Sequence, residues 1–450
     1  MTSKFDDLRL KYPVFEYCGY DWKIDDDTIE FSFNFTCSDI VFKPTQKHSF
    51  SKNVIITEDN LKTMAFYLGM IELISYYKAF LSPVISIKCG KLSESDITFW
   101  SNLYLNGLGE FFYINNICFG ADLFKIVSSG KQHLPIVVPK SDKTLIPVGG
   151  GKDSIVSLEI LKNIDSKPFV INSSPSQMRS ILISGYKETE LLKVDRNLDK
   201  KIIELNNQGF WNGHTPFSAM LAITSSVSAL LNGFSNIALS NEFSASEGNI
   251  IFNNMVINHQ YSKSLEAERA ISQYIKYRLS ESIHYFSFLR PFYELKIAEL
   301  FTRYDKHLFS FRSCNKGSKS DSWCGNCPKC LFVASILLPF VGSVKLISIF
   351  KKDIFSNKDL LDDFKGLTGL RELKPLECVG TINEVKAAIS KSIRKENGYK
   401  PFLIQFFLEN FNSQEIDRFN DDFDFILKFF NNDNLIEENS VFHKILLSVL

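Results

Sequence analysis

Three consecutive glycines stand between a short apolar run and a helical pattern in the stretch TLIPVGGGKDSIVSLEIL, residues 144–161. The glycines are Gly149, Gly150 and Gly151. When a glycine loop joins a strand to a helix, backbone N–H groups and the positive end of the helix point at the same place, which suits an anion. Glycine also lets the backbone approach phosphate oxygens without a Cβ in between. The stretch therefore predicts a phosphate-binding turn on a strand–helix unit.

The three residues after the glycines carry side chains that suit a nucleotide phosphate. Lys152 would add positive charge, Asp153 is placed to hold Mg²⁺, and Ser154 would donate a hydrogen bond from the helix start. The Walker A pattern fails because Asp153 follows Lys152, and the dinucleotide pattern G-x-G-x-x-G fails as well. The loop resembles the S-G-G-x-D-S loop of the ATP pyrophosphatases, which split ATP into AMP and pyrophosphate, with Gly149 in place of the first serine. This resemblance implies that residues 149–154 bind ATP; a plain turn with spare glycines is the alternative.

Strand and helix patterns alternate from Leu145 onward. We expect strands near 145–148, 168–172, 191–195, 236–240 and 284–289. We expect helices near 153–163, 176–184, 216–232, 262–279 and 293–304. Repeated strand–helix units predict an α/β fold with a parallel sheet covered by helices on both faces. The glycine loop implies that this sheet is that of a PP-loop ATP pyrophosphatase.

The patterns divide the chain into three parts. In TIEFSFNFTCSDIVFKP, residues 28–44, apolar side chains fall two apart, which is the period of a strand, and helical stretches follow near 60–81 and 93–106. Beyond residue 342 the chain reads as mostly helical, with phenylalanine-rich helical core in its last part. The expected domains are an N-terminal α+β domain that could bind substrate (1–140), the ATP pyrophosphatase domain (141–342) and a mostly helical C-terminal region (343–450).

Composition limits the class of partner. Lys and Arg number 51 and Asp and Glu number 51, so the formal net charge is zero, whereas proteins that bind nucleic acid more often carry a basic excess. The first ten residues contain no apolar signal core. The longest apolar stretch, 61–81, is interrupted by charged residues, which indicates a buried helix rather than a membrane span. We expect a soluble, cytoplasmic protein without a membrane or nucleic-acid partner.

Four of the nine cysteines cluster in SCNKGSKSDSWCGNCPKC, residues 313–330. They are Cys314, Cys324, Cys327 and Cys330. Four thiolates at such spacings can enclose a tetrahedral Zn²⁺ and leave no coordination position open, so the predicted zinc is structural. An iron–sulfur cluster is the alternative, because cysteine spacing alone does not separate the two.

A longer stretch around these cysteines, residues 290–330, is similar to the zinc-bearing end of 7-cyano-7-deazaguanine synthase, itself an ATP pyrophosphatase. That family continues C-x-x-C-x-x-R, whereas here Leu331 and Phe332 follow Cys330. Four short motifs fit another family better: ALSNEFSASEGN (238–249), VINHQYSKSLEAE (256–268), WCGNCPKCLFV (323–333) and KPLECVGT (374–381). Together with VGGGKDS and in this order, they resemble the UDP-N-acetylmuramoyl-L-alanyl-L-glutamate epimerases of bacterial cell-wall synthesis.

This resemblance implies a use for ATP. The terminal glutamate carboxylate of the UDP-linked muramoyl dipeptide would attack the α-phosphorus of ATP and give an acyl-adenylate. The repelling negative charge is then gone, so a base can remove the α-proton, and hydrolysis after inversion gives D-glutamate, AMP and diphosphate. The loop, with Lys152 and Asp153 in catalytic roles, would stabilise the leaving pyrophosphate together with Mg²⁺.

The residue that moves the proton is less well defined by the sequence. The candidates follow predicted strands or lie in nearby loops: Glu242, Glu247, His214, His259 and Lys263. We expect Glu242 and His259 to take part, since an imidazole has a suitable intrinsic pKa, although Glu242 could instead be a metal ligand or a helix cap. Cys378 is a further candidate because cofactor-independent racemases commonly use thiols, but a lone cysteine is more often a buried core residue.

Two other readings of the sequence stay open. One keeps the loop chemistry but modifies a base or a tRNA, as the similarity to 7-cyano-7-deazaguanine synthase implies. The other is a non-catalytic, zinc-stabilised module that binds ATP without turning it over.

Overall fold

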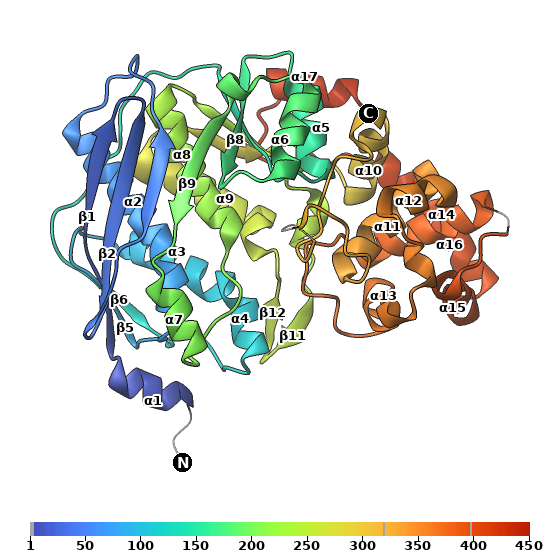
Figure 1. Cartoon of the computed structure of the whole chain (residues 1–450), viewed down its shortest axis with the longest axis horizontal. Helices are drawn as coiled ribbons and strands as arrows, with labels where there is room; N and C mark the ends of the chain where they lie inside the picture. Colours follow the sequence, from blue (N-terminus) through green and yellow to red (C-terminus); the bar gives the residue numbers. More distant parts are fainter. Residues whose placement is uncertain (1–3, 318–319, 397) are drawn as a thin grey trace.

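The computed structural model describes residues 4–317, 320–396 and 398–450. One large mixed sheet forms its centre (Figure 1). Its strands are β1 (Val14–Asp25), β2 (Thr28–Cys37), β3 (Ile40–Phe42), β4 (Thr45–Ser49), β5 (Val84–Ile87), β6 (Lys125–Ser128), β7 (Thr144–Pro147), β8 (Ser166–Ile171), β9 (Leu192–Asn197), β10 (Asn236–Leu239) and β13 (His284–Ser287). They lie in the order β13-β10-β7-β8-β9-β4-β2-β1-β5-β6, and β3 pairs with β2.

The five strands from β13 to β9 are parallel to their neighbours, which confirms the parallel sheet expected after residue 144. Strands β9 and β4 then pair antiparallel, so the sheet continues without a break into the N-terminal strands. The alternation in residues 28–44 corresponds to β2, whose every second side chain is buried. Because strands from both sides of residue 140 share this sheet, the division into domains remains a prediction.

Helices cover both faces of the parallel strands, as expected. In β7, β8, β10 and β13, neighbouring residues point into different cores: Leu145, Phe169, Ile237 and Tyr285 into one, and Ile146, Val170, Ala238 and Phe286 into the other. The first core includes helices α2 (Glu58–Tyr77) and α8 (Phe217–Asn232). The second includes α5 (Lys152–Leu161) and α10 (Glu294–Thr302). Burial on both faces explains why these strands read as continuous apolar runs.

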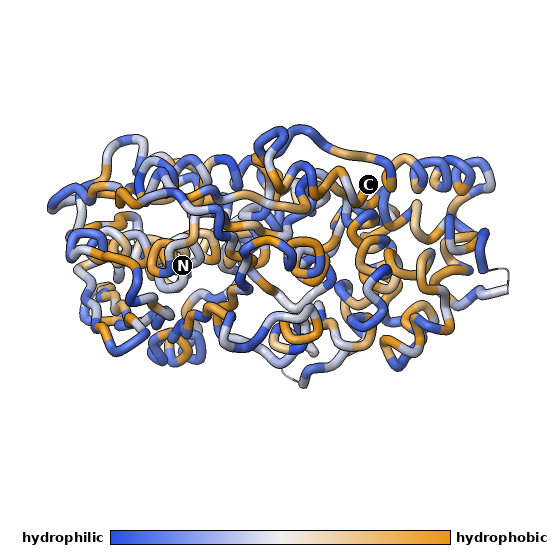
Figure 2. The backbone as a smooth tube through the Cα atoms, turned by 90° about the horizontal axis from the view of Figure 1, so that it is seen from above, coloured by the Kyte–Doolittle hydropathy of each residue, from blue (hydrophilic) through white to orange (hydrophobic). Residues whose placement is uncertain are grey.

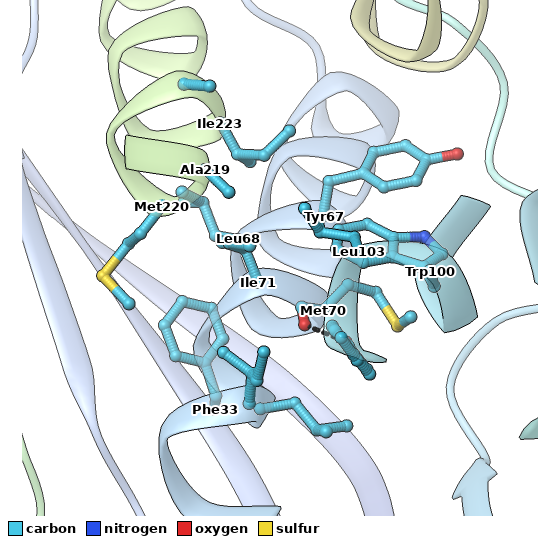
Figure 3. Close-up of a cluster of buried hydrophobic side chains, with 14 of the residues drawn as sticks. Phe33, Tyr67, Leu68, Met70, Ile71, Trp100, Leu103, Ala219, Met220 and Ile223 are labelled. Atoms are coloured by element: carbon cyan, nitrogen blue, oxygen red, sulfur yellow. Dashed lines mark hydrogen bonds between the residues drawn. The ribbon is translucent and has the colours of Figure 1, made fainter. Parts of the chain in front are cut away.

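Helix α2 lies inside the first core and begins at a Thr57–Asn60 capping box. Figure 3 shows its side chains between α8 and helix α3 (Glu94–Gly107). Its buried Glu72 pairs with Arg196 of β9, with an Oε1–Nη2 distance of 2.6 Å, which satisfies the charge within this apolar helix. Among the helices that the structure describes, none is long and apolar enough to cross a membrane.

The last part of the chain is helical, as expected, and all of its helices except the final one gather at the end of the molecule opposite β1 and β2 (Figure 1). Its helices are α11 (Pro328–Val341), α12 (Ser343–Phe350), α13 (Leu361–Leu367), α14 (Ile382–Lys395), α15 (Phe402–Asn410), α16 (Ser413–Lys428) and α17 (Val441–Ser448). Figure 2 shows hydrophobic segments passing through the interior of this bundle. The phenylalanine-rich stretches belong to α15 and α16 and bury Phe407, Phe419 and Phe423.

The remaining elements are α1 (Lys4–Lys11), α4 (Gly109–Ile114), α6 (Pro175–Ser184), α7 (Lys201–Asn207), α9 (Leu265–Tyr274) and the hairpin β11 (Ile250–Phe252) with β12 (Met255–Ile257). A π-helical turn, Ile275–Leu279, continues α9. Strands β1, β5 and β6 were not expected from the sequence, because β1 is partly exposed and polar along its second half and the other two are only four residues long.

Candidate active site

The glycine loop lies where expected, between the carboxyl end of β7 and the first turn of α5. Gly150 has a φ of +81°, a conformation that side chains rarely adopt, and its carbonyl accepts a hydrogen bond of 3.1 Å from the Arg312 amide. The Ser154 hydroxyl accepts from the Gly150 amide at 3.1 Å and donates to the Gly151 carbonyl at 3.0 Å. The Ser154 hydroxyl therefore links two backbone groups of the loop. At Gly149, in contrast, an added Cβ would meet nothing within 4 Å.

A buried lysine joins the loop to α10. The Lys152 ammonium contacts both the Asp153 and the Glu294 carboxylates, and Lys152 and Glu294 side chains are each 2% exposed. Burial lowers the pKa of Lys152. The Asp153 side chain is 26% exposed and so keeps one side open beside the loop. Because two carboxylates share the Lys152 ammonium, an oxygen of Asp153 is available to coordinate a hard cation such as Mg²⁺.

The four clustered cysteines come together as the sequence predicts. Their sulfur atoms all lie within 4.8 Å of one another, with 3.8 Å between Cys314 and Cys327 and 3.7 Å between Cys324 and Cys330. Four thiols in this arrangement fit a tetrahedral ion, and the cluster could bind zinc. The loop before it packs on the glycine loop, because a Cβ at Gly151 would lie 2.8 Å from the Ser313 hydroxyl.

Glu242 lies just beyond the carboxyl end of β10 and is 3% exposed. Its backbone carbonyl accepts a hydrogen bond from Arg290, which also pairs with the buried Glu268. The negative charges of Glu242 and Asp153 both act on Lys263, and Glu242 also acts on Lys152. Glu242 thus acts electrostatically on a lysine of the glycine loop and on a lysine of the second charged group of the site.

That second group centres on Cys378, in the segment between α13 and α14. Its thiol accepts a hydrogen bond of 3.3 Å from the Lys263 ammonium and is also hydrogen-bonded to His259. Burial alone would raise the pKa of Cys378, but the charge of Lys263 and the hydrogen bond with His259 lower it to about 6. The thiol is therefore poised to be a thiolate near neutral pH.

His259 connects this thiol to a carboxylate on α4. Its Nδ1 donates to Glu110, and the side chains of His259 and Glu110 are 12% and 11% exposed. Burial alone would lower the pKa of His259, but the hydrogen bonds to Cys378 and Glu110 raise it to about 9. His214 also faces Glu110 at 3.4 Å, and burial lowers its pKa to about 4. Glu110 therefore holds one protonated and one neutral imidazole.

The segment that carries Cys378 is anchored to the loops after β10. Lys374 donates to Glu247 at 2.9 Å, the Asn249 side chain donates to the Pro375 carbonyl at 2.7 Å, and Gln260 donates to the Val379 carbonyl at 3.1 Å. The motifs 238–249, 256–268 and 374–381 thus meet in space although they are far apart in sequence. Glu247, a candidate for proton transfer, takes part in this anchoring instead.

The motif that carries the cysteine cluster also contacts the Cys378 segment. Lys329 on the first turn of α11 donates to the Cys378 carbonyl, and Cys327 caps that helix by accepting from the Cys330 amide at 3.4 Å. The positive charge of Lys329 acts on both Cys378 and Lys152. The cysteine cluster thereby fixes a lysine between the glycine loop and Cys378.

Family comparisons decide which group of proteins this arrangement belongs to. Residues 7–288 match the MurL N-terminal domain and residues 310–420 match the MurL C-terminal domain. The chain belongs to the MurL family. The resemblance read from the short motifs is thereby confirmed.

MurL relatives in three bacteria are similar along most of the chain. The proteins of Xanthomonas oryzae pv. oryzae and of a Micromonospora species are each 34% identical to it, over 72% of this chain and 73% of their own length. The protein of Salinispora tropica is 33% identical over 74% of each chain. All three are named UDP-N-acetyl-alpha-D-muramoyl-L-alanyl-L-glutamate epimerase. No solved structure gives a significant match to the chain.

Four residues of this MurL site were not expected from the sequence: Glu110, Glu294, Lys329 and Cys378. Glu294 lies in the helix expected near 293–304, where nothing in the sequence marks it, and Glu110 lies outside the expected helices. Only the fold brings these two carboxylates to the site. Lys329 could have been suspected from its place inside the cysteine motif. The only signal in the sequence that favours Cys378 over an ordinary buried cysteine is its motif, KPLECVGT.

Proposed function

We propose that this protein is an ATP-dependent epimerase of peptidoglycan precursor synthesis. It inverts the terminal L-glutamate of UDP-N-acetylmuramoyl-L-alanyl-L-glutamate and forms AMP and diphosphate. Membership of the MurL family and the names of three relatives support the substrate and the inversion. The glycine loop on a strand–helix unit supports the use of ATP and the PP-loop class.

One observation carries the proposal: the charged groups of the loop act on those around Cys378. Lys152 contacts Glu294 and Asp153. Lys263 contacts Cys378, and His259 pairs with Glu110. The negative charges of Asp153 and Glu242 also act on Lys263. Activation of a carboxylate and removal of the neighbouring α-proton must happen on adjacent atoms. A phosphate-binding loop adjoining an acid–base group is the arrangement that such a reaction needs.

Each part of the loop has a role in the activation. The backbone amides of Gly149 and Gly151 and the start of α5 would bind the phosphates, and Asp153 would hold Mg²⁺, which offsets the charge of the leaving pyrophosphate. Arrival of the phosphates would draw Lys152 from its carboxylates toward the new negative charge. Lys329 and Lys263 add positive charge on the side of Cys378, where the glutamate carboxylate would be bound.

The experiment is incubation in D₂O with ATP, Mg²⁺ and UDP-N-acetylmuramoyl-L-alanyl-L-glutamate. The proposal expects AMP, diphosphate and D-glutamate, with one solvent deuterium at the α-carbon of the product. Failure of the folded, zinc-loaded protein to form AMP with this nucleotide dipeptide would contradict the proposal. AMP formation that needs a nucleobase or tRNA instead would support the base-modifying reading.

A further inference from the structure

We propose that Cys378 is the catalytic residue that removes the α-proton, with His259 as its proton relay and Glu110 as the positioning residue of that relay. This inference rests on the proposed function and names the group that performs its proton transfer. It is independent of how ATP is bound.

The first argument is the set of contacts around the thiol. Lys263 donates to the Cys378 sulfur at 3.3 Å, and His259 is hydrogen-bonded to the same sulfur. Both neighbours stabilise a thiolate rather than a thiol, because each offers a positive N–H. Among the cysteines that the structure describes, those at positions 18, 37, 89 and 118 have no such cationic pair, and four others form the cysteine cluster.

The second argument is that the backbone around the thiol is fixed from three directions. Lys329 of α11 holds the Cys378 carbonyl, Gln260 holds the Val379 carbonyl, and Lys374 spans from Glu247 to the Gly380 carbonyl at 3.2 Å. A cysteine that only fills space in a core does not need this support. A nucleophile or base does, because its atom must be held in one position relative to the substrate.

The third argument is the relay behind the thiol. His259 bridges Cys378 and Glu110, its backbone amide donates to the Asn249 side chain at 2.8 Å, and its ring contacts that of His214, with 4.7 Å between centroids. The imidazole is thus fixed in orientation, with one ring nitrogen toward the sulfur and the other toward a carboxylate. This is how a base is coupled to an orienting group in enzymes that activate thiols.

The α-proton leaves the substrate to Cys378, and a solvent proton replaces it on the opposite face. The Cys378 thiolate takes the α-proton of the adenylated glutamate, so an S–H bond forms, the C–H bond breaks, and its electron pair moves to the acyl oxygen as an enolate. A water molecule returns a proton to the opposite face of the α-carbon and becomes hydroxide. Cys378 then releases its proton through His259, and this proton neutralises the hydroxide. One solvent hydrogen enters the product, and the thiolate–imidazolium pair is restored.

The experiment compares Cys378→Ala with the wild type and with a matched control, Cys18→Ala, whose partly buried thiol contacts Thr36 away from the site. All three are incubated in D₂O with ATP, Mg²⁺ and the UDP-linked L-glutamyl dipeptide. We expect Cys378→Ala to form AMP within about threefold of wild type, because activation of the carboxylate does not use the thiol. We expect its D-glutamate and α-deuterium to fall by at least about 100-fold, the usual contribution of a general base.

Each outcome has one meaning. D-glutamate formation by Cys378→Ala within about tenfold of wild type would overturn the inference. Loss of AMP together with D-glutamate, in a variant that keeps its zinc and its circular dichroism, would assign Cys378 to substrate binding and overturn it as well. The absence of substrate-dependent AMP from the wild type and from Cys18→Ala would be a failure of the proposed function instead.

A second variant tests the relay. Glu110→Gln keeps the shape of the side chain but cannot stabilise an imidazolium as a carboxylate does. We expect D-glutamate formation to fall by about 10- to 100-fold while AMP formation is kept, and the rate of Cys378 alkylation by iodoacetamide at neutral pH to decrease. An unchanged alkylation rate would show that Glu110 does not position the relay.

Discussion

The two halves of the site are built in different ways. The glycine loop is a continuous stretch of a few residues on one strand–helix unit, so its residue types and spacing are visible in the sequence. The Cys378 group takes single residues from four distant segments: Glu110 on α4, His214 before α8, His259 and Lys263 after β12, and Cys378 before α14. The proposed phosphate binding would therefore rely on local backbone shape, whereas the proposed proton transfer would rely on tertiary contacts between side chains.

The largest effect is expected at the cysteine cluster, because it supports both the glycine loop and the Cys378 group. Cys330→Ser removes a thiolate, and loss of a structural zinc costs on the order of 10 kcal/mol of folding free energy. We expect a zinc-free protein with a strongly lowered Tm and neither ATP binding nor proton transfer, since Arg312 and Lys329 both lose their anchor. Metal analysis and thermal unfolding check this.

The matched control for the zinc prediction is Cys89→Ser, at a partly buried cysteine outside the cluster. We expect it to keep one zinc ion per chain. Iron and sulfide in place of zinc would contradict the structural zinc site, and a second metal ion per chain would contradict the relay role of His259 and its positioning by Glu110.

The next largest effect is expected to differ between two adjacent glycines of the loop, Gly149 and Gly150. Gly150→Ala places a side chain at a φ of +81° and 2.9 Å from the Ser176 hydroxyl, so we expect a loss of about 1 to 3 kcal/mol in ATP binding. Gly149→Ser meets open space and introduces the hydroxyl that ATP pyrophosphatase loops carry, so ATP binding should be unchanged or tighter. Titration calorimetry with ATP and Mg²⁺ measures both. Equal losses in the two variants would contradict the loop geometry.

A smaller effect is expected in the pH profile of D-glutamate formation. The pKa of Cys378 is lowered to about 6, so the thiolate is present above that pH, and the pKa of His259 is raised to about 9, so the imidazolium is present below that pH. The active pair therefore exists between about pH 6 and 9, and the rate should rise through the first value and fall through the second.

Two variants should move the two limbs of this profile separately. Lys263→Met removes the main positive charge near the thiol, so the acid limb should shift to higher pH. Glu110→Gln removes a group that favours the imidazolium, so the alkaline limb should shift to lower pH. Movement of the same limb by both variants would contradict the assignment of the pair.

The difference between the halves also explains what could be predicted from the sequence. Strands β7, β8, β10 and β13 can be predicted because burial on both faces makes them apolar runs bounded by helices, whereas β9 is buried on one face only. The cysteine cluster can be predicted because its four cysteines are close in sequence. Glu110 could not be predicted, because it lies in the six-residue helix α4, outside the helices expected from the sequence. Cys378 needed its neighbours Lys263 and His259 to distinguish it from a buried thiol.

We propose that the glycine loop activates the carboxylate and that the Cys378 group inverts the α-carbon. The most direct test is the ratio of D-glutamate to AMP formed from the UDP-linked dipeptide by wild type, Asp153→Ala and Cys378→Ala. We predict that Asp153→Ala loses both products together, because nothing is activated, and that Cys378→Ala keeps AMP and loses D-glutamate. The same ratio of D-glutamate to AMP in Cys378→Ala and in the wild type would contradict the division of labour.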